Sequence, residues 1–291
     1  MREGIAFPLS LPLDFPKGEY ARGPRKPPEL ASTPLGHNNH FLAGTDDVVS
    51  DDFATIYLQY STQWASFAHA GAVFDLDGTG EPVICYYNGH RAGVDVIGAP
   101  DGSVKPHARA LGIETVAQTG VQGRGVLVDL ESVTGHDRVA VGHGMLTEIL
   151  RAQDIAIEPG DILCLHTGLT KIMLDLGDEL THEVLDSSCA YLDATDDRLL
   201  QWITDSGISA IVADNLAVER FSLEPAPGAR NVLPLHDHCL FRQGIPLGEM
   251  WYFHDLNAWL RENHRSRFLL TAPPLRLSGA VGSPVSGVAT V

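Results

Sequence analysis

The chain has 291 residues, of which 44% are hydrophobic and 20% are charged, a composition typical of a globular protein with an ample core. Its formal net charge of −17 argues against nucleic acid and anionic membranes as partners, because both bind basic patches. The four cysteines form no Cys-x-x-Cys pair, and no apolar run reaches the length of about eighteen residues that a membrane span needs. We therefore expect a reduced, cytoplasmic protein without a signal peptide or a membrane span.

Seven prolines interrupt the first 45 residues and exclude a long helix there. We predict an extended N-terminal arm over residues 1–45 that wraps the domain or a neighbouring subunit, with a partly ordered tail as the alternative. Residues 46–291 are expected to form a single domain.

The segment from Tyr57 to His69 mixes aromatic rings, amides and a histidine. Apolar and polar residues alternate over residues 56–61, which predicts a strand that enters a loop. Polar side chains at the end of a strand are a common place for chemistry, because a rigid scaffold displays them.

The middle of the chain alternates apolar runs with amphipathic segments, a pattern that favours an α/β fold. Residues 74–81 read as an acidic turn, and residues 107–120 as a helix or a turn. Apolar runs predict strands, and helical spacing predicts helices, over the following ranges: strands 125–130, 162–168, 208–215 and 268–274, and helices 145–151, 193–206 and 256–260.

Three polar positions at strand ends leave alternatives open. His166 is interpreted as a polar residue on the face of its strand rather than as part of a site. Asp214 and Asn215 either line a pocket or fasten their loop through backbone N–H groups. Later in the chain, His236 and His238 form a His-x-His pair whose two rings share one face of an extended segment, which suits metal ligation.

The segment Gln59–His69 resembles, without gaps, the motif His-x-Gly-Thr-His-x-Asp-x-Pro-x-His of the cyclase family of metal-dependent hydrolases, which includes bacterial kynurenine formamidases and isatin hydrolases. Thr62 and His69 match the motif, whereas Gln59 and Gln63 stand where its first two histidines stand. The phrases Thr62-Gln63-Trp64 and Tyr86-Tyr87-Asn88-Gly89 are similar to one branch of the family. The resemblance continues to the Ser283-Pro284 phrase near the C-terminus.

The resemblance implies a swivelling β/β/α fold with a barrel-like mixed sheet, and a subunit that forms a homodimer or homotetramer. It also implies that a histidine and a glutamate from the late part of the chain reach the metal. Glu249 matches the glutamate. His236 fits the histidine better than His238, with an ambiguity of one residue.

Ala65 departs from the family, which has a metal-binding aspartate at this position. Three interpretations are open: an inactivated Asp→Ala variant, a natural branch that uses another ligand, or loss of the metal. The first is favoured because Thr62-Gln63-Trp64 is otherwise kept and a methyl group is the usual replacement for disabling a carboxylate.

These residues predict hydrolysis of an amide, lactam or lactone bond in a small cyclic or aromatic carbonyl compound. A divalent ion, manganese or zinc, would activate water and polarise the carbonyl, and His69 would transfer protons together with Glu249. The expected metal ligands are Gln59, Gln63, His236 and His238. The expected substrate contacts are Trp64, Ala65, Phe67, Asn88, Asp214 and Asn215.

Two rival functions remain open. One is a metal-free cyclase, isomerase or dehydratase that uses His69 and Glu249 as acid and base. The other is a non-catalytic protein that binds small molecules on the same scaffold.

Overall fold

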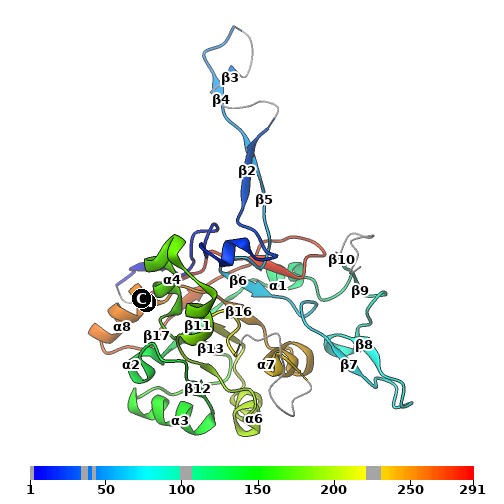
Figure 1. Ribbon diagram of the computed structural model, residues 1–291, viewed down its shortest axis with the longest axis vertical. Coiled ribbons are helices and arrows are strands. Elements are labelled where there is room, and N and C mark those ends of the chain that lie inside the picture. Colours follow the sequence, from blue (N-terminus) through cyan, green and yellow to red (C-terminus); the bar gives the residue numbers. More distant parts are fainter. Residues whose placement is uncertain (1–2, 34–38, 41–43, 99–106, 221–230) are drawn as a thin grey trace.

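The computed structural model describes residues 3–33, 39–40, 44–98, 107–220 and 231–291. Its centre is a nine-stranded mixed sheet that curls into a half-barrel (Figure 1). The strand order across the sheet is β1 (Ala6–Pro8), β19 (Val288–Thr290), β17 (Arg267–Thr271), β11 (Gln122–Asp129), β13 (Ile162–His166), β15 (Ala210–Ala213), β16 (Leu247–Glu249), β6 (Gln63–Ala65) and β18 (Gly282–Pro284).

Four neighbouring strands, β11, β13, β15 and β16, run parallel to one another. The connections between them carry α2 (Glu131–Thr134), α3 (His143–Ala152), α6 (Asp197–Ser206) and α7 (Pro234–His236), which continues into the π-helical segment η4 (Asp237–Gln243). Because parallel strands require crossover connections, the carboxyl ends of all four strands meet at one edge of the sheet.

The remaining helices flank this block. They are α1 (Ile113–Thr119), α4 (Leu169–Leu176), α5 (His182–Ser187), α8 (His254–Glu262) and the short 3-10 turns Tyr20–Arg22, Tyr87–Gly89 and Gly177–Glu179. Among the described helices, none combines the length and the apolarity that crossing a bilayer requires.

Both faces of the sheet are buried, each in its own hydrophobic core. Leu163 and Leu165 of β13 pack on the side of α3 and α6, whereas Ile162 and Cys164 pack on the side of α1 and α8. This follows from the alternation of side chains along a strand. The same alternation determines on which face of the sheet each polar side chain of these strands lies.

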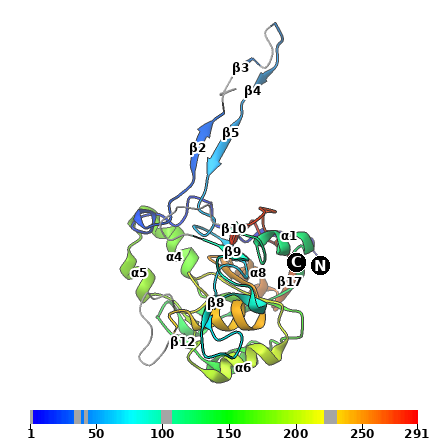
Figure 2. The same cartoon turned by 90° about the vertical axis from the view of Figure 1, so that its right-hand side faces the viewer.

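Two hairpins project from the body (Figures 1 and 2). The longer one consists of β2 (Glu29–Ser32) with β5 (Asp52–Thr55), extended by β3 (Asn39–His40) with β4 (Val48–Val49). The shorter one pairs β7 (Ala72–Phe74) with β8 (Val83–Cys85). Two further short pairs join β9 (Val96–Ile97) to β10 (His107–Ala108) and β12 (Ala140–Val141) to β14 (Tyr191–Leu192).

The predicted α/β class with a barrel-like mixed sheet is confirmed, as are the strands and helices predicted between residues 125 and 274. The strand predicted over residues 56–61 is wrong. Tyr60 N–H donates to Tyr57 O across a turn, and the strand begins only at Gln63. All three residues of β6 are buried, so this strand has no polar face that an alternation could reveal.

One other sequence expectation has a mixed outcome. Residues 107–120 do contain a helix, but they begin as strand β10 and the helix starts at Ile113. The division into an arm over residues 1–45 and a domain over residues 46–291 stays a prediction. In the described part of the arm, β1 pairs with β19 in the main sheet, and β2 pairs across the boundary with β5.

Candidate functional site

Two adjacent strands bring the first pair of predicted site residues together. Gln63 of β6 lies opposite Glu249 of β16 in the antiparallel register. The Gln63 Nε2 amide donates to Glu249 Oε2 over 2.6 Å, and both side chains are buried. Their strand neighbours Ala65 and Leu247 belong to the core beneath α3 and α6, so this pair faces the same side of the sheet.

His236 links Glu249 to a second carboxylate. Its Nε2 lies 3.0 Å from Glu249 Oε1, and its Nδ1 lies 2.8 Å from Glu219 Oε1. Glu219 also accepts the backbone N–H groups of Leu235 and His236, so it caps the start of α7 while it orients the ring. Burial opposes protonation of the ring, but the two carboxylates outweigh burial and raise the pKa of His236 to about 9.

His69 lies beside this chain of contacts. Its ring centroid is 6.3 Å from that of His236, and its backbone N–H donates to Ser66 O. Burial lowers the pKa of His69 to about 4; the negative charge of Glu249 opposes this shift, whereas the positive charges of His236 and Arg25 reinforce it. His69 is therefore neutral around pH 7. Sequence alone does not show how enclosed this ring is, so the lowered pKa could not be predicted from it.

The N-terminal segment contributes two residues that sequence reasoning missed. Arg25 Nη1 donates to the backbone oxygen of Gln59, and Tyr20 packs its ring 5.5 Å from that of Tyr60. Burial raises the pKa of Tyr20, and among the charges that act on this phenol are Arg25 and Glu249. Tyr20 and Arg25 thus lie within electrostatic reach of the buried carboxylate.

Tyr20 and Arg25 also line a cavity of about 630 Å³. Its other walls include the apolar Leu185 and Leu216 and two more cationic side chains, Arg138 and Arg220. A cavity of this size accommodates a small organic molecule. The arginines make it electropositive in a protein whose net charge is −17.

The donor set around Glu249 fits a divalent ion, although with few ligands. Gln63 Oε1 is buried and has no hydrogen-bond partner among the described residues, so an acceptor oxygen is left free next to the Glu249 carboxylate. His236, backed by Glu219, is oriented as metal-ligating histidines usually are. Ala65 supplies no ligand on the same side of β6, so a single carboxylate, a single imidazole and an amide oxygen remain.

The structure places the other predicted metal ligands elsewhere. The amide of Gln59 lies against Gly282, where an added Cβ would come within 2.5 Å of Nε2. His238 is turned away from Glu249, and its Nε2 lies 3.0 Å from Thr204 Oγ1. The His-x-His pair does not share one face, because the segment is helical rather than extended and successive side chains diverge.

The predicted substrate residues are dispersed as well. Trp64 packs edge-to-face on Trp251 and donates Nε1–H to Ala272 O. Asn88 adopts a left-handed backbone conformation in the turn Tyr87–Gly89. Asn215 bonds the backbone of its own loop through Val218 and reaches Ala190 O. None of these three contacts the Glu249 cluster through a described hydrogen bond.

Asp214 fastens a loop, one of the two alternatives left open by the sequence. Its Oδ1 accepts Thr167 N–H and Thr167 Oγ1–H, and its Oδ2 accepts Gly168 N–H. Burial raises the pKa of this carboxyl against the effect of those hydrogen bonds. Its described contacts are structural.

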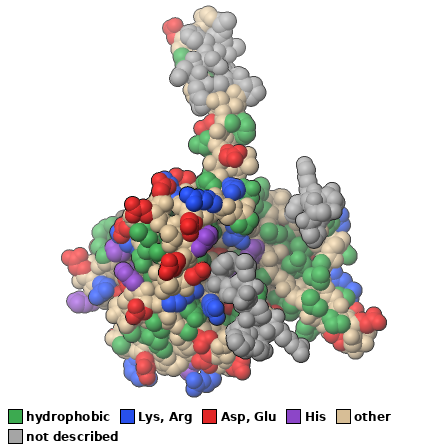
Figure 3. Space-filling model, in the orientation of Figure 1, with side chains coloured by type: hydrophobic (Ala, Val, Ile, Leu, Met, Phe, Trp, Pro, Cys, Tyr) green, Lys and Arg blue, Asp and Glu red, His purple; other side chains and the backbone are tan. Residues whose placement is uncertain are grey.

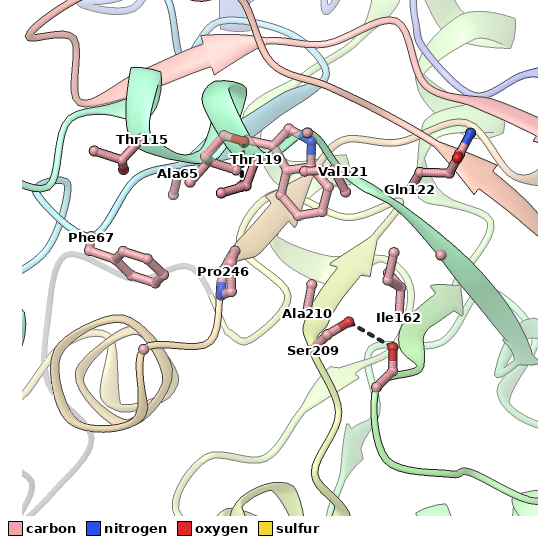
Figure 4. A pocket seen from close by; sticks show the side chains of 16 residues that line it. Ala65, Phe67, Thr115, Thr119, Val121, Gln122, Ile162, Ser209, Ala210 and Pro246 are labelled. Carbon is pink, nitrogen blue, oxygen red and sulfur yellow. Dashed lines mark hydrogen bonds between the residues drawn. The ribbon is translucent and has the colours of Figure 1, made fainter.

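Ala65, Phe67 and Trp64 line a different cavity, of about 560 Å³, at the amino ends of β13 and β15 (Figure 4). Figure 4 shows Ala65 beside Thr115 and Thr119 of α1, across from Pro246. The residues lining this cavity do not include His69, His236 or Glu249. The walls of this cavity therefore differ from the Glu249 cluster, although Ala65 shares one side of β6 with Gln63.

A second group of side chains that could hold a metal ion, Glu131, His166 and His254, was also missed from the sequence. His166 lies on one face of β13, and its ring is buried beside carboxylates, of which that of Asp129 is the nearest. The sequence of β13 does not reveal these surroundings, because the side chains next to the His166 ring come from α2, α8 and the end of β11.

Comparisons with known proteins agree with this architecture. The model of the family described as "Putative cyclase" matches residues 11–220, and the chain belongs to this family. A search of curated proteins found no match.

Among solved structures, a protein described as a novel cyclase is 27% identical, with a TM-score of 0.75 over 100% of this chain and 90% of the other. Isatin hydrolase A from Labrenzia aggregata, solved with benzyl benzoate, is 12% identical, with a TM-score of 0.62 over 99% and 93% of the two chains. A predicted metal-dependent hydrolase from Bacillus stearothermophilus is 16% identical, with a TM-score of 0.54 over 98% of both chains. The resemblance seen in the sequence is thereby confirmed.

Proposed function

We propose that this chain is a metal-dependent hydrolase that opens an amide, lactam or lactone bond in a small cyclic or aromatic carbonyl compound. The observation that carries this proposal is the contact of Glu249 with Gln63 and His236, which come from two distant parts of the chain, with His69 beside them. Membership of the cyclase family supports it, as does the likeness in fold to isatin hydrolases. Four free, buried cysteines support a reducing, cytoplasmic setting.

Glu249, His236 and Gln63 would hold the ion. When bound, the ion would polarise a carbonyl oxygen and acidify a bound water. Gln59 and His238 are not needed in this arrangement. An oxygen-rich set with one imidazole suits manganese at least as well as zinc.

His69 would move the proton. As a neutral imidazole, it can accept a proton from the attacking water and return it to the leaving nitrogen or oxygen. The cavity beneath Tyr20 and Arg25 would receive the remainder of the substrate, because these residues reach both the cavity and the field of Glu249.

The direct test measures turnover of a panel of cyclic amides, lactones and N-formyl aromatic amines with added Mn²⁺ or Zn²⁺. We expect activity that depends on metal and falls by about 10²- to 10⁴-fold in His69→Ala, the range for loss of a general acid–base group. Metal-independent turnover that still requires His69 would instead favour the isomerase, cyclase or dehydratase alternative. Ligand binding without turnover would favour the binding protein.

The acid limb of the pH–rate profile should lie well below the ordinary histidine range. A base works only when neutral, and burial lowers the pKa of His69 to about 4. Activity should therefore persist as the pH falls through 6.5 and decline only towards 4. Measurement of kcat/KM between pH 3.5 and 8 checks this, and an acid limb centred near 6.5 would contradict it.

Ala65→Asp should increase both metal content and activity. The new carboxylate would lie on the side of β6 that carries Gln63 and would add a charged ligand. We expect the affinity for Mn²⁺ to rise by about tenfold or more. Metal analysis after dialysis measures this, and Ala65→Asn, which adds similar volume without charge, is the control. Equal metal content in the Asp variant and the parent chain would remove position 65 from the site.

We further propose that the chain forms a homodimer or homotetramer through the β2–β5 hairpin. Leu30 and Phe53 are more than half exposed on this hairpin, and Figure 3 shows hydrophobic side chains along its stem. Isolated exposed apolar residues are common, but a projecting two-stranded ribbon is only marginally stable without a partner.

Light scattering of Leu30→Asp combined with Phe53→Asp should show a smaller particle than the parent chain. Val94→Asp, at an exposed apolar residue outside the hairpin, should leave the mass unchanged. A monomeric parent chain would contradict this proposal.

A further inference from the structure

Three side chains with metal-binding atoms meet near the carboxyl ends of β11 and β13. Glu131 begins α2, His166 ends β13 and His254 begins α8, and one ligand atom from each lies within 4.8 Å of the others. The alternation along β13 puts His166 on the same face as Cys164, whose core packs against α8. Glu249 shares the face of Leu247, so the two groups lie on opposite faces of the sheet.

His166 has an unused ligand atom. Its side chain is 1% exposed, and Nε2 is buried without a hydrogen-bond partner in the part of the chain that the structure describes. Nδ1 lies 3.2 Å from Asp129 Oδ1 and 3.1 Å from the side-chain amide of Asn257. A histidine that donates one ring N–H to a carboxylate presents the lone pair of its other nitrogen, and metal-ligating histidines usually have such a partner.

The surroundings carry excess negative charge. Glu131 Oε2 lies 3.5 Å from His166 Nδ1, Asp129 lies closer still, and Asp214 Oδ2 lies 3.9 Å from Nε2. The guanidinium of Arg261, 3.3 Å from Asp129 Oδ2, offsets one of these charges. A cation placed among them therefore gains electrostatic energy.

A proton is the simplest such cation. Burial opposes protonation of His166, but the neighbouring carboxylates outweigh it and raise the pKa of His166. A proton does not explain why a second imidazole, that of His254, stands 6.2 Å from the first between ring centroids. Two imidazoles and a carboxylate are a ligand set typical of zinc, with a fourth position left for water.

We propose that Glu131, His166 and His254 bind a zinc ion at a site separate from the Glu249 cluster. Glu131 and His254 are only partly buried, so the ion can enter from solvent without opening the core. The ion would tie the starts of α2 and α8 to the end of β13. Nothing in the proposed hydrolysis uses these three residues.

The test titrates metal-free protein with Zn²⁺ against a chromophoric chelator. The parent chain and Glu249→Gln should both retain one tight site, whereas His254→Ala and Glu131→Gln should bind at least about tenfold more weakly. His90→Ala, at a histidine paired with Asp95 in another part of the chain, is the control and should match the parent. Zn²⁺ should raise the melting temperature of the parent and of Glu249→Gln, but not that of His254→Ala.

Two results would overturn the proposal. One is an absence of tight Zn²⁺ binding to the parent chain. The other is tight binding that His254→Ala and Glu131→Gln leave intact while Glu249→Gln removes it. The proposed hydrolysis is judged separately, because Glu249→Gln should lose turnover and keep this zinc.

Discussion

Glu249→Gln should lower kcat/KM by about 10²- to 10⁴-fold while the protein remains folded. Of the carboxylates in the described ranges, Glu249 is the one that contacts both Gln63 and His236, and it is buried. The amide keeps the shape but removes the negative charge. His236 then loses one of the two carboxylates that raise its pKa, and an ion held there would lose the anionic ligand that Glu249 supplies.

Steady-state kinetics on the substrate panel, together with metal analysis, measures this effect. Glu158→Gln is a matched control, because Glu158 is a half-exposed carboxylate that pairs with Arg124 and Arg267 at the surface. Circular dichroism should show both variants folded. Undiminished turnover by Glu249→Gln would rule out the Glu249 cluster as the active site.

Asp214→Ala should lower the free energy of unfolding by roughly 3 to 5 kcal/mol. The carboxylate is 1% exposed and accepts three hydrogen bonds, two of them from the backbone N–H groups of Thr167 and Gly168. Alanine leaves those donors buried without acceptors, and each such loss costs about 1 to 3 kcal/mol. A domain whose free energy of unfolding is about 5 to 15 kcal/mol would lose a large part of its stability.

Urea denaturation measures the loss, and Asp193→Ala provides the comparison. Asp193 likewise accepts a backbone N–H and a hydroxyl, both from Thr195 two residues along the chain, but at a partly exposed position. Water can replace that acceptor, so the cost should stay below about 1 kcal/mol. Equal losses in the two variants would show that burial does not govern the effect at Asp214.

The parts of the fold that sequence reasoning predicted are those with a local signature. The strands β13 and β15 and the second half of β11 are mainly apolar runs, and α6 shows helical spacing that ends at Gly207. The strand β6 has only three residues, and all are buried, so no local pattern distinguishes it from a loop. The pairing of β1 with β19 joins opposite ends of the chain, and the sequence of neither strand indicates its partner.

In the candidate site, too, residues with a sequence signature could be predicted and residues without one could not. Gln63, His236 and Glu249 could be identified because each stands at a defined position of a family motif. The structure brings the three side chains together. Glu219, Tyr20 and Arg25 could not, because their roles arise from contacts between segments distant in sequence. The low pKa of His69 was equally out of reach, since it comes from enclosure by those segments.

The double role of Glu219 has a consequence for ligand binding. One carboxylate holds the first N–H groups of α7 and the Nδ1 of His236, so the helix cannot start without fixing the ring. The imidazole is therefore immobilised when the chain folds, before any ligand arrives. The side-chain entropy of His236 is therefore lost during folding, and a ligand that binds at Glu249 does not have to offset it. For a freely rotating side chain this entropy is worth about 0.5 to 1.5 kcal/mol.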